Sequence, residues 1–144
     1  MTTPKLDPYL FFDGNCAEAM RFYHATLGGK MDVMLRYGDS PQRGQCPPGS
    51  TDRIMHTSID LGGQLLMASD VPEGQPYDGM RNVSLSLFYP SVDEAKRIFD
   101  SLAEGGKVIM ALAPTFWADI FGMLTDRYGT SWMIGGGVKE KPPA

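Results

Sequence analysis

A short, strand-like apolar segment occurs twice along the chain, each time just before a helical pattern. Residues 9–12 read Tyr-Leu-Phe-Phe and residues 85–88 read Leu-Ser-Leu-Phe, and turn residues follow both segments. The apolar spacing after each turn predicts an amphipathic helix. The pattern therefore predicts two strand–helix units, one after the other.

The two predicted helices are related in sequence. Residues 18–23 (Glu-Ala-Met-Arg-Phe-Tyr) resemble residues 94–99 (Glu-Ala-Lys-Arg-Ile-Phe), and each copy runs on to Gly-Gly-Lys. Ser91 is a suitable N-cap for the second helix, and Glu94 completes a capping box with it. The glycine pair ends each helix, because glycine adopts the left-handed conformation at little cost.

Three more extended segments follow each helix, and an Asp-x-x-Gly turn joins the last two. The motif Asp-x-x-Gly-x-x-x-Met begins at Asp60 and again at Asp126, so Met67 and Met133 hold equivalent positions. Each copy reads βαβββ. We predict a single α+β domain over residues 1–144, built from two tandem βαβββ modules at about 7–75 and about 80–137.

Composition and charge narrow the class of protein. The length of 144 residues suits one domain, and 13 basic against 17 acidic residues give a net charge of −4. This balance lacks the basic footprint of a nucleic-acid-binding protein. No apolar run reaches the roughly 20 residues of a membrane helix, and the first residues lack the features of a signal peptide. We expect a cytoplasmic protein that binds neither nucleic acid nor membrane.

Two cysteines, Cys16 and Cys46, are too few for a disulfide framework. Cys16 stands where the first helix is expected to begin, and a helix N-terminus lowers the pKa of a thiol. Cys16 is therefore either a reactive thiol or a small, buried, apolar side chain, and the sequence leaves both open.

Several motifs resemble one known family. Residues 10–19 (Leu-Phe-Phe-Asp-Gly-Asn-Cys-Ala-Glu-Ala) are followed by Phe22-Tyr23, and the C-terminal half carries residues 115–118 (Thr-Phe-Trp-Ala) and 125–129 (Thr-Asp-Arg-Tyr-Gly). With these motifs the chain resembles the PhnB-like subgroup of the vicinal oxygen chelate superfamily over residues 7–134. Glyoxalase I, bleomycin-resistance proteins and extradiol dioxygenases belong to this superfamily.

The resemblance implies a glyoxalase-like fold, in which curved mixed sheets surround a cavity for a small organic molecule, and it implies a homodimer. Metal-dependent members place His or Glu at four inward-facing strand positions. Counted from the matching motifs, these positions hold Pro8, Met67, Asn82 and Met133 here. None of these side chains suits a divalent cation in such a site. We therefore expect no metal and no other cofactor.

Strand parity then predicts which side chains line the cavity, because side chains two apart share a face of a strand. In residues 54–61 the more polar face, which carries His56, is assigned to the cavity, whereas Tyr9 and Phe11 are assigned to the helix side. The predicted ligand-binding residues combine apolar groups, hydroxyls, an amide and one imidazole, and are Phe12, His56, Ser58, Met67, Asn82, Ser84 and Met133.

His56 is the best candidate for a catalytic residue, because an imidazole serves as a general base or a hydrogen-bond donor near neutral pH. The alternative is a histidine bonded only to a neighbouring strand or turn. We expect Asp70 to cap a turn or a helix end, and Trp132 to pack in the core. The glycine run 135–137 is expected to form a flexible tail.

The first functional hypothesis is a metal-free protein that binds a small molecule, either to sequester it or to carry out a metal-independent reaction. The alternative is a metal-dependent lyase, isomerase or dioxygenase whose ligands have moved to His56, Asp60 or Asp70. A module that only dimerises is a third possibility. Whether the protein is an enzyme stays open from the sequence.

Overall fold

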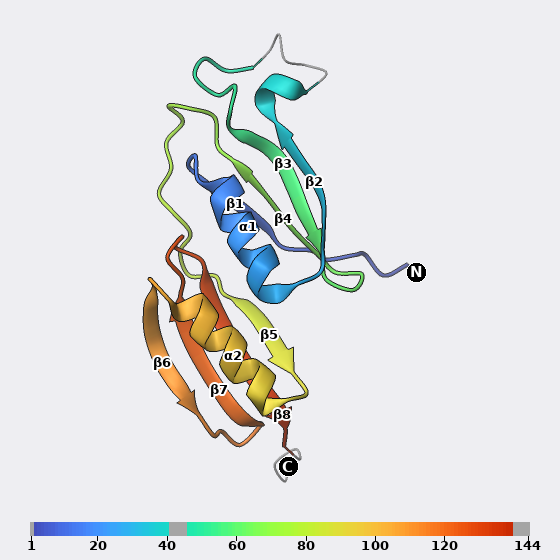
Figure 1. Ribbon diagram of the computed structural model, residues 1–144, viewed down its shortest axis with the longest axis vertical. Helices are drawn as coiled ribbons and strands as arrows, with labels where there is room; N and C mark the ends of the chain where they lie inside the picture. Colours follow the sequence, from blue (N-terminus) through green and yellow to red (C-terminus); the bar gives the residue numbers. More distant parts are fainter. Residues whose placement is uncertain (1, 41–45, 140–144) are drawn as a thin grey trace. The chain divides into compact units, whose positions relative to one another are not determined.

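The structure is a computed structural model that describes residues 2–40 and 46–139 (Figure 1). The chain divides into two compact units, Met1–Gly79 and Met80–Ala144. The boundary falls between the two ranges that the repeat predicts for the modules. Among the described residues, no helix has the length and apolar character needed to cross a membrane.

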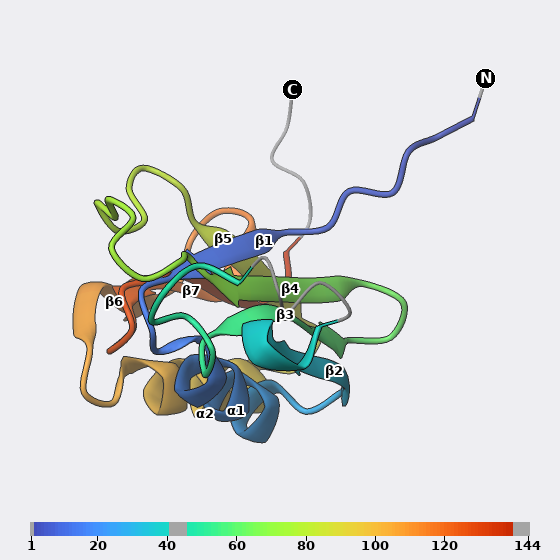
Figure 2. The same ribbon diagram turned by 90° about the horizontal axis from the view of Figure 1, so that it is seen from above.

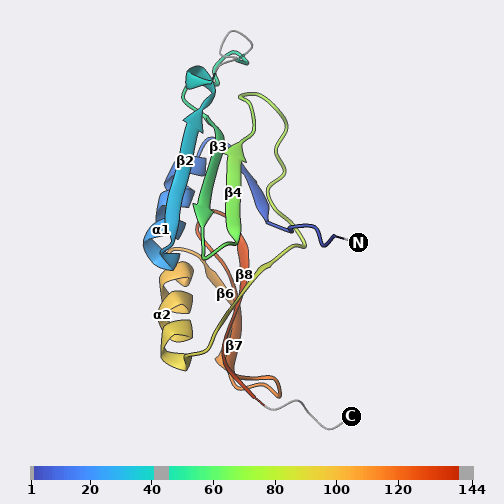
Figure 3. The ribbon, with the colours of Figure 1, turned by 90° about the vertical axis from the view of Figure 1, so that its right-hand side faces the viewer.

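The first unit is a four-stranded mixed sheet with one helix. Its strands lie in the order β1-β4-β3-β2, with β1 parallel to β4 and the other neighbours antiparallel. The helix packs against β3 and β4 and covers one face of this sheet (Figure 3). The elements are β1 (Tyr9–Phe12), α1 (Cys16–Leu27), β2 (Lys30–Arg36), the short 3-10 helix η1 (Tyr37–Asp39), β3 (Ile54–Asp60) and β4 (Leu65–Asp70).

The second unit repeats this topology. Its strands lie in the order β5-β8-β7-β6, again with one parallel pair, β5 with β8. The helix α2 packs against the sheet of its own unit, as Figure 2 shows from above. The elements are β5 (Leu85–Tyr89), α2 (Val92–Ala103), β6 (Lys107–Ala113), β7 (Ala118–Thr125) and β8 (Ser131–Val138). The predicted α+β class and the two βαβββ modules are confirmed.

The core of the first unit lies between α1 and its sheet, and it corrects one prediction. Leu10 and Phe12 are buried there, whereas Tyr9 and Phe11 are 38% and 51% exposed on the other face. The parity predicted for β1 was therefore wrong by one residue. All four residues of this strand are apolar or aromatic, so its sequence does not distinguish the two faces.

The core of the second unit confirms the predicted place of Trp132. Its ring is buried, and its Nε1–H donates to Oδ2 of Asp126 at 2.8 Å. The predicted N-cap is confirmed as well, since Ser91 Oγ accepts from the backbone N–H of Glu94 at 3.2 Å.

The glycine run 135–137 is a buried part of strand β8, so the predicted flexible tail was wrong. A Cβ at Gly135 would lie 2.8 Å from the ring of Phe88, and one at Gly136 would lie 2.6 Å from Cβ of Ala95 on α2. Glycine is required here because neighbouring groups pack directly on the backbone of β8.

Candidate functional site

The sheet of the first unit has one face that α1 does not cover, which we call the first open face. Strand register decides its members: Tyr9 lies beside Met67, Met67 beside Ser58, and Ser58 beside Val33. A second row contains Phe11 beside Ser69 and His56 beside Leu35. The two rows of the first open face are therefore Tyr9, Met67, Ser58 and Val33, and Phe11, Ser69, His56 and Leu35.

Three rings gather on this face and form what we call the aromatic platform, Tyr9, Phe11 and His56. The rings of Tyr9 and His56 are stacked, with centroids 5.7 Å apart and planes at 24°, and the hydroxyl of Tyr9 lies 3.1 Å from Nδ1 of His56. The ring of Phe11 lies 5.1 Å from that of Tyr9. Because β4 separates β1 from β3, the side chain of Tyr9 crosses that strand to reach His56.

The contact with Tyr9 fixes the orientation of His56. When the phenol O–H donates to Nδ1, the neutral imidazole carries its proton on Nε2; when Nδ1–H donates to the phenol oxygen, Nε2 is an acceptor. In both cases the contact occupies Nδ1 and leaves Nε2 as the ring nitrogen for another molecule. The structure thus supplies the partner of His56 that the sequence did not identify.

The predicted ligand-binding residues are divided between the two units. His56, Ser58 and Met67 share the first open face, whereas Phe12 is buried under α1 and cannot touch a ligand there. Met133 lies in β8 beside Ser86, on the face of the second sheet opposite that of Trp132.

Asn82 and Ser84 precede β5 and are exposed, and Asn82 has a left-handed backbone with φ of 60°. They are therefore not members of a strand, and the parity argument does not apply to them. Sequence reasoning missed Tyr9 and Phe11 because it placed them on the helix side. Only the structure corrects this assignment, because it shows that Leu10 and Phe12, one residue later, are the buried pair.

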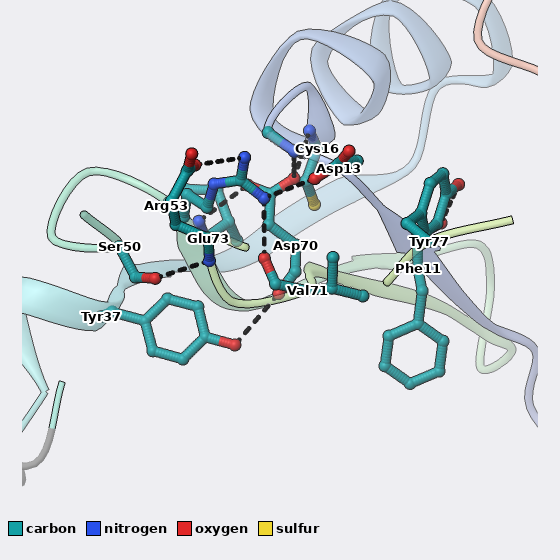
Figure 4. Close-up of polar contacts among 12 residues, drawn as sticks. Phe11, Asp13, Cys16, Tyr37, Ser50, Arg53, Asp70, Val71, Glu73 and Tyr77 are labelled. Atoms are coloured by element: carbon teal, nitrogen blue, oxygen red, sulfur yellow. Dashed lines mark hydrogen bonds and ion pairs between the residues drawn. The ribbon is translucent and has the colours of Figure 1, made fainter. Parts of the chain in front are cut away.

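Asp70 joins three segments at the end of β4 (Figure 4). Its Oδ1 accepts from the backbone N–H groups of Gly14 and Cys16 at 2.8 and 3.0 Å, and its Oδ2 accepts from that of Ile54 at 2.9 Å. Asp70 therefore caps the start of α1, as expected, in place of Asn15, whose side chain makes no capping bond.

Arg53 ties the same region together from the exposed side. Its guanidinium donates to Asp13 and to the carbonyl of Val71, both at 2.8 Å, and pairs with Glu73 at 2.6 Å (Figure 4). The cluster holds the β1–α1 turn against the ends of β3 and β4. All of its groups bind one another, which is typical of a structural role.

Cys16 is fully buried beside this cluster. Burial raises the pKa of its thiol far above the ordinary value, and the nearby Asp70 carboxylate raises it further. The thiol is neutral at physiological pH, and of the two roles left open for Cys16, the structure supports the buried one.

The proposed relocated metal ligands do not come together. Asp60 Oδ1 accepts from the N–H of Gly63 at 2.7 Å in its own turn, and Asp70 faces α1 rather than His56. Within residues 2–40 and 46–139, no three side chains of the types His, Cys, Asp and Glu form a group that could hold a metal ion. The side chains on the first open face do not fit a divalent cation.

Comparison with known proteins gives the family. The model of the Glyoxalase/Bleomycin resistance protein/Dioxygenase superfamily matches residues 5–134. The chain belongs to this superfamily. Protein YjdN of Escherichia coli K12 is 40% identical over 147 residues, which cover 95% of this chain and 97% of YjdN.

Two solved structures are also similar to this chain. Protein PA1353 from Pseudomonas aeruginosa shares 47% identity and a TM-score of 0.87, covering 94% of this chain and 98% of its own. The PhnB protein from Bacillus cereus shares 27% identity and a TM-score of 0.77, covering 93% and 100%. The resemblance found in the sequence motifs is confirmed.

Proposed function

We propose that this superfamily member binds a small organic molecule on the first open face without a metal ion, to sequester it or to support a metal-independent reaction. The observation that carries the proposal is the hydrogen-bonded and stacked pair of Tyr9 and His56. A sheet face with exposed aromatic rings and a few fixed polar groups has the composition of a small-molecule site.

The individual residues support different parts of such a site. The rings of Tyr9 and Phe11 offer apolar surface, and the polarisable thioether of Met67 adapts to varied apolar groups. His56 supplies a polar group that orients a ligand, whereas Ser58 is buried, at 7% exposed, and its contact with a ligand stays a prediction. The participation of Asn82, Ser84 and Met133, from the second unit, stays a prediction.

A fragment screen by protein-observed NMR tests the proposal. We expect binding fragments to shift the Met67 methyl and His56 ring signals. His56→Ala removes the orienting hydrogen bond and should weaken their binding by about 1 kcal/mol, or about fivefold in Kd.

The second histidine is a matched control. His24 lies on α1, where its Nε2 contacts the carbonyl of Gly29 at 3.2 Å, so His24→Ala should leave fragment binding unchanged. The proposal is wrong if no fragment shifts the His56 and Met67 signals, or if both histidine variants weaken binding equally.

A further inference from the structure

The charges around the first open face restrict what it can bind. Its two rows contain no Asp, Glu, Lys or Arg among the described residues, and the next row along the same face holds Leu65 and the oppositely charged neighbours Asp60 and Lys30. At one end Lys30 pairs with Asp32 at 3.6 Å. At the other end the guanidinium groups of Arg36 and Arg53 are held by carboxylates.

Among the described residues, an anionic ligand would therefore find no cation at this face that lacks a carboxylate partner, since even the exposed Lys30 already lies 3.6 Å from Asp32. Arg53 binds Asp13 and Glu73 and its side chain is only 16% exposed, while Arg36 binds Asp39 at 2.8 Å and Asp52 at 3.6 Å. Moving an anion from water to such a surface costs solvation energy that no countercharge repays. These contacts favour an uncharged ligand.

The geometry of the aromatic platform favours a ligand with a flat ring. Tyr9 and His56 are already stacked at 24°, and Phe11 lies tilted by 40° beside Tyr9, so the rings offer faces and edges to another flat ring. Aromatic pairs gain about 0.5–1.5 kcal/mol beyond the area they bury, which an aliphatic ring does not gain.

The polar part of the site favours an acceptor on the ligand. In the tautomer in which the phenol of Tyr9 donates to Nδ1, His56 presents Nε2–H outward. We propose that the ligand is an uncharged, planar aromatic molecule whose acceptor oxygen takes the hydrogen bond from His56 Nε2. This inference rests on the proposed function, of which it names the ligand class.

Three matched probes test the ligand class by NMR titration of the intact protein. The first, 1-naphthamide, is flat and neutral with a carbonyl acceptor; decahydronaphthalene-1-carboxamide keeps the acceptor without the aromatic ring; naphthalene-1-phosphonate keeps the ring and is anionic. We expect 1-naphthamide to bind most tightly and the decahydro compound about 2- to 10-fold more weakly. The phosphonate should bind more weakly still.

Variants test whether the aromatic platform causes the differences in binding between the probes. Phe11→Leu keeps an apolar side chain but removes a ring. It should weaken the binding of 1-naphthamide about 2- to 10-fold and leave the binding of the decahydro compound unchanged. Phe116→Leu is the control, because Phe116 is an exposed phenylalanine in the other unit. Tyr9→Phe keeps the ring but removes the hydrogen bond to Nδ1 of His56, so it should weaken the binding of both carboxamides.

The outcomes separate the two proposals. If the phosphonate or the decahydro compound binds as tightly as 1-naphthamide, the ligand class is wrong and the binding function stands. If the screened fragments move the His56 and Met67 signals but 1-naphthamide does not, the ligand class is again wrong. If neither fragments nor probes move them, both proposals are wrong.

Discussion

Asp70 shows how much of the first unit depends on one buried side chain. It is 2% exposed, and its two oxygens accept from three backbone N–H groups on two other segments. A capping role was expected, but the capped helix begins 54 residues earlier in the chain, which no local pattern reveals.

We expect Asp70→Asn to destabilise the protein by about 2–4 kcal/mol. When the amide oxygen of the Asn side chain points towards Gly14 and Cys16, its amide nitrogen faces the N–H of Ile54. Two hydrogen-bond donors then face each other at a buried position. Chemical denaturation measures the loss of unfolding free energy. Asp100→Asn, at an exposed position of α2, should change stability by less than about 0.5 kcal/mol. Equal effects of the two substitutions would contradict the capping role.

The strands differ in how far their sequences determine their faces. In β3, polar residues mark one face, and the predicted grouping of His56, Ser58 and Met67 on the face away from α1 agrees with the strand register. In β1 both faces are apolar, so the parity could not be read and the aromatic platform was missed. A slip of one residue exchanges the two faces of a strand completely.

The edge strands differ in the same way. β2 carries charged side chains at Lys30, Asp32 and Arg36, which blunt an edge against pairing with another chain. β6 is also an edge strand, but its exposed residues include Val108, Ile109 and Met110, and it has a single charged residue at its start. We predict that the protein self-associates at this edge.

Ile109→Lys should therefore reduce self-association at high protein concentration, as measured by light scattering, while stability stays within about 0.5 kcal/mol. Val138→Lys introduces the same charge at an exposed position outside β6 and should leave association unchanged. An unchanged association of the Ile109 variant would show that this edge does not pair.

At the scale of the whole molecule, the duplicated topology came directly from the sequence repeat, because both copies keep the same helix ends and Asp-x-x-Gly turns. The homodimer and the cytoplasmic location stay predictions. Light scattering of the unmodified protein measures the first, and fractionation of cells measures the second.

Metal removal and addition test the metal-free proposal on the intact protein. We expect treatment with a chelator, or titration with Zn²⁺, Ni²⁺, Mn²⁺ or Fe²⁺, to leave the melting temperature unchanged, because only binding to the native state raises it. Elemental analysis provides the control. A stoichiometric metal that raises the melting temperature and is lost in His56→Ala would favour the metal-dependent alternative.

The sequence by itself determined the repeat, the order of the elements and the family, since these depend on local spacing and composition. The tertiary structure decided the faces of β1, the glycine strand under α2, the capping of α1 by Asp70 and the pairing of Tyr9 with His56. Each of these depends on contacts between segments far apart in the chain, where register and close packing, rather than local pattern, select the arrangement.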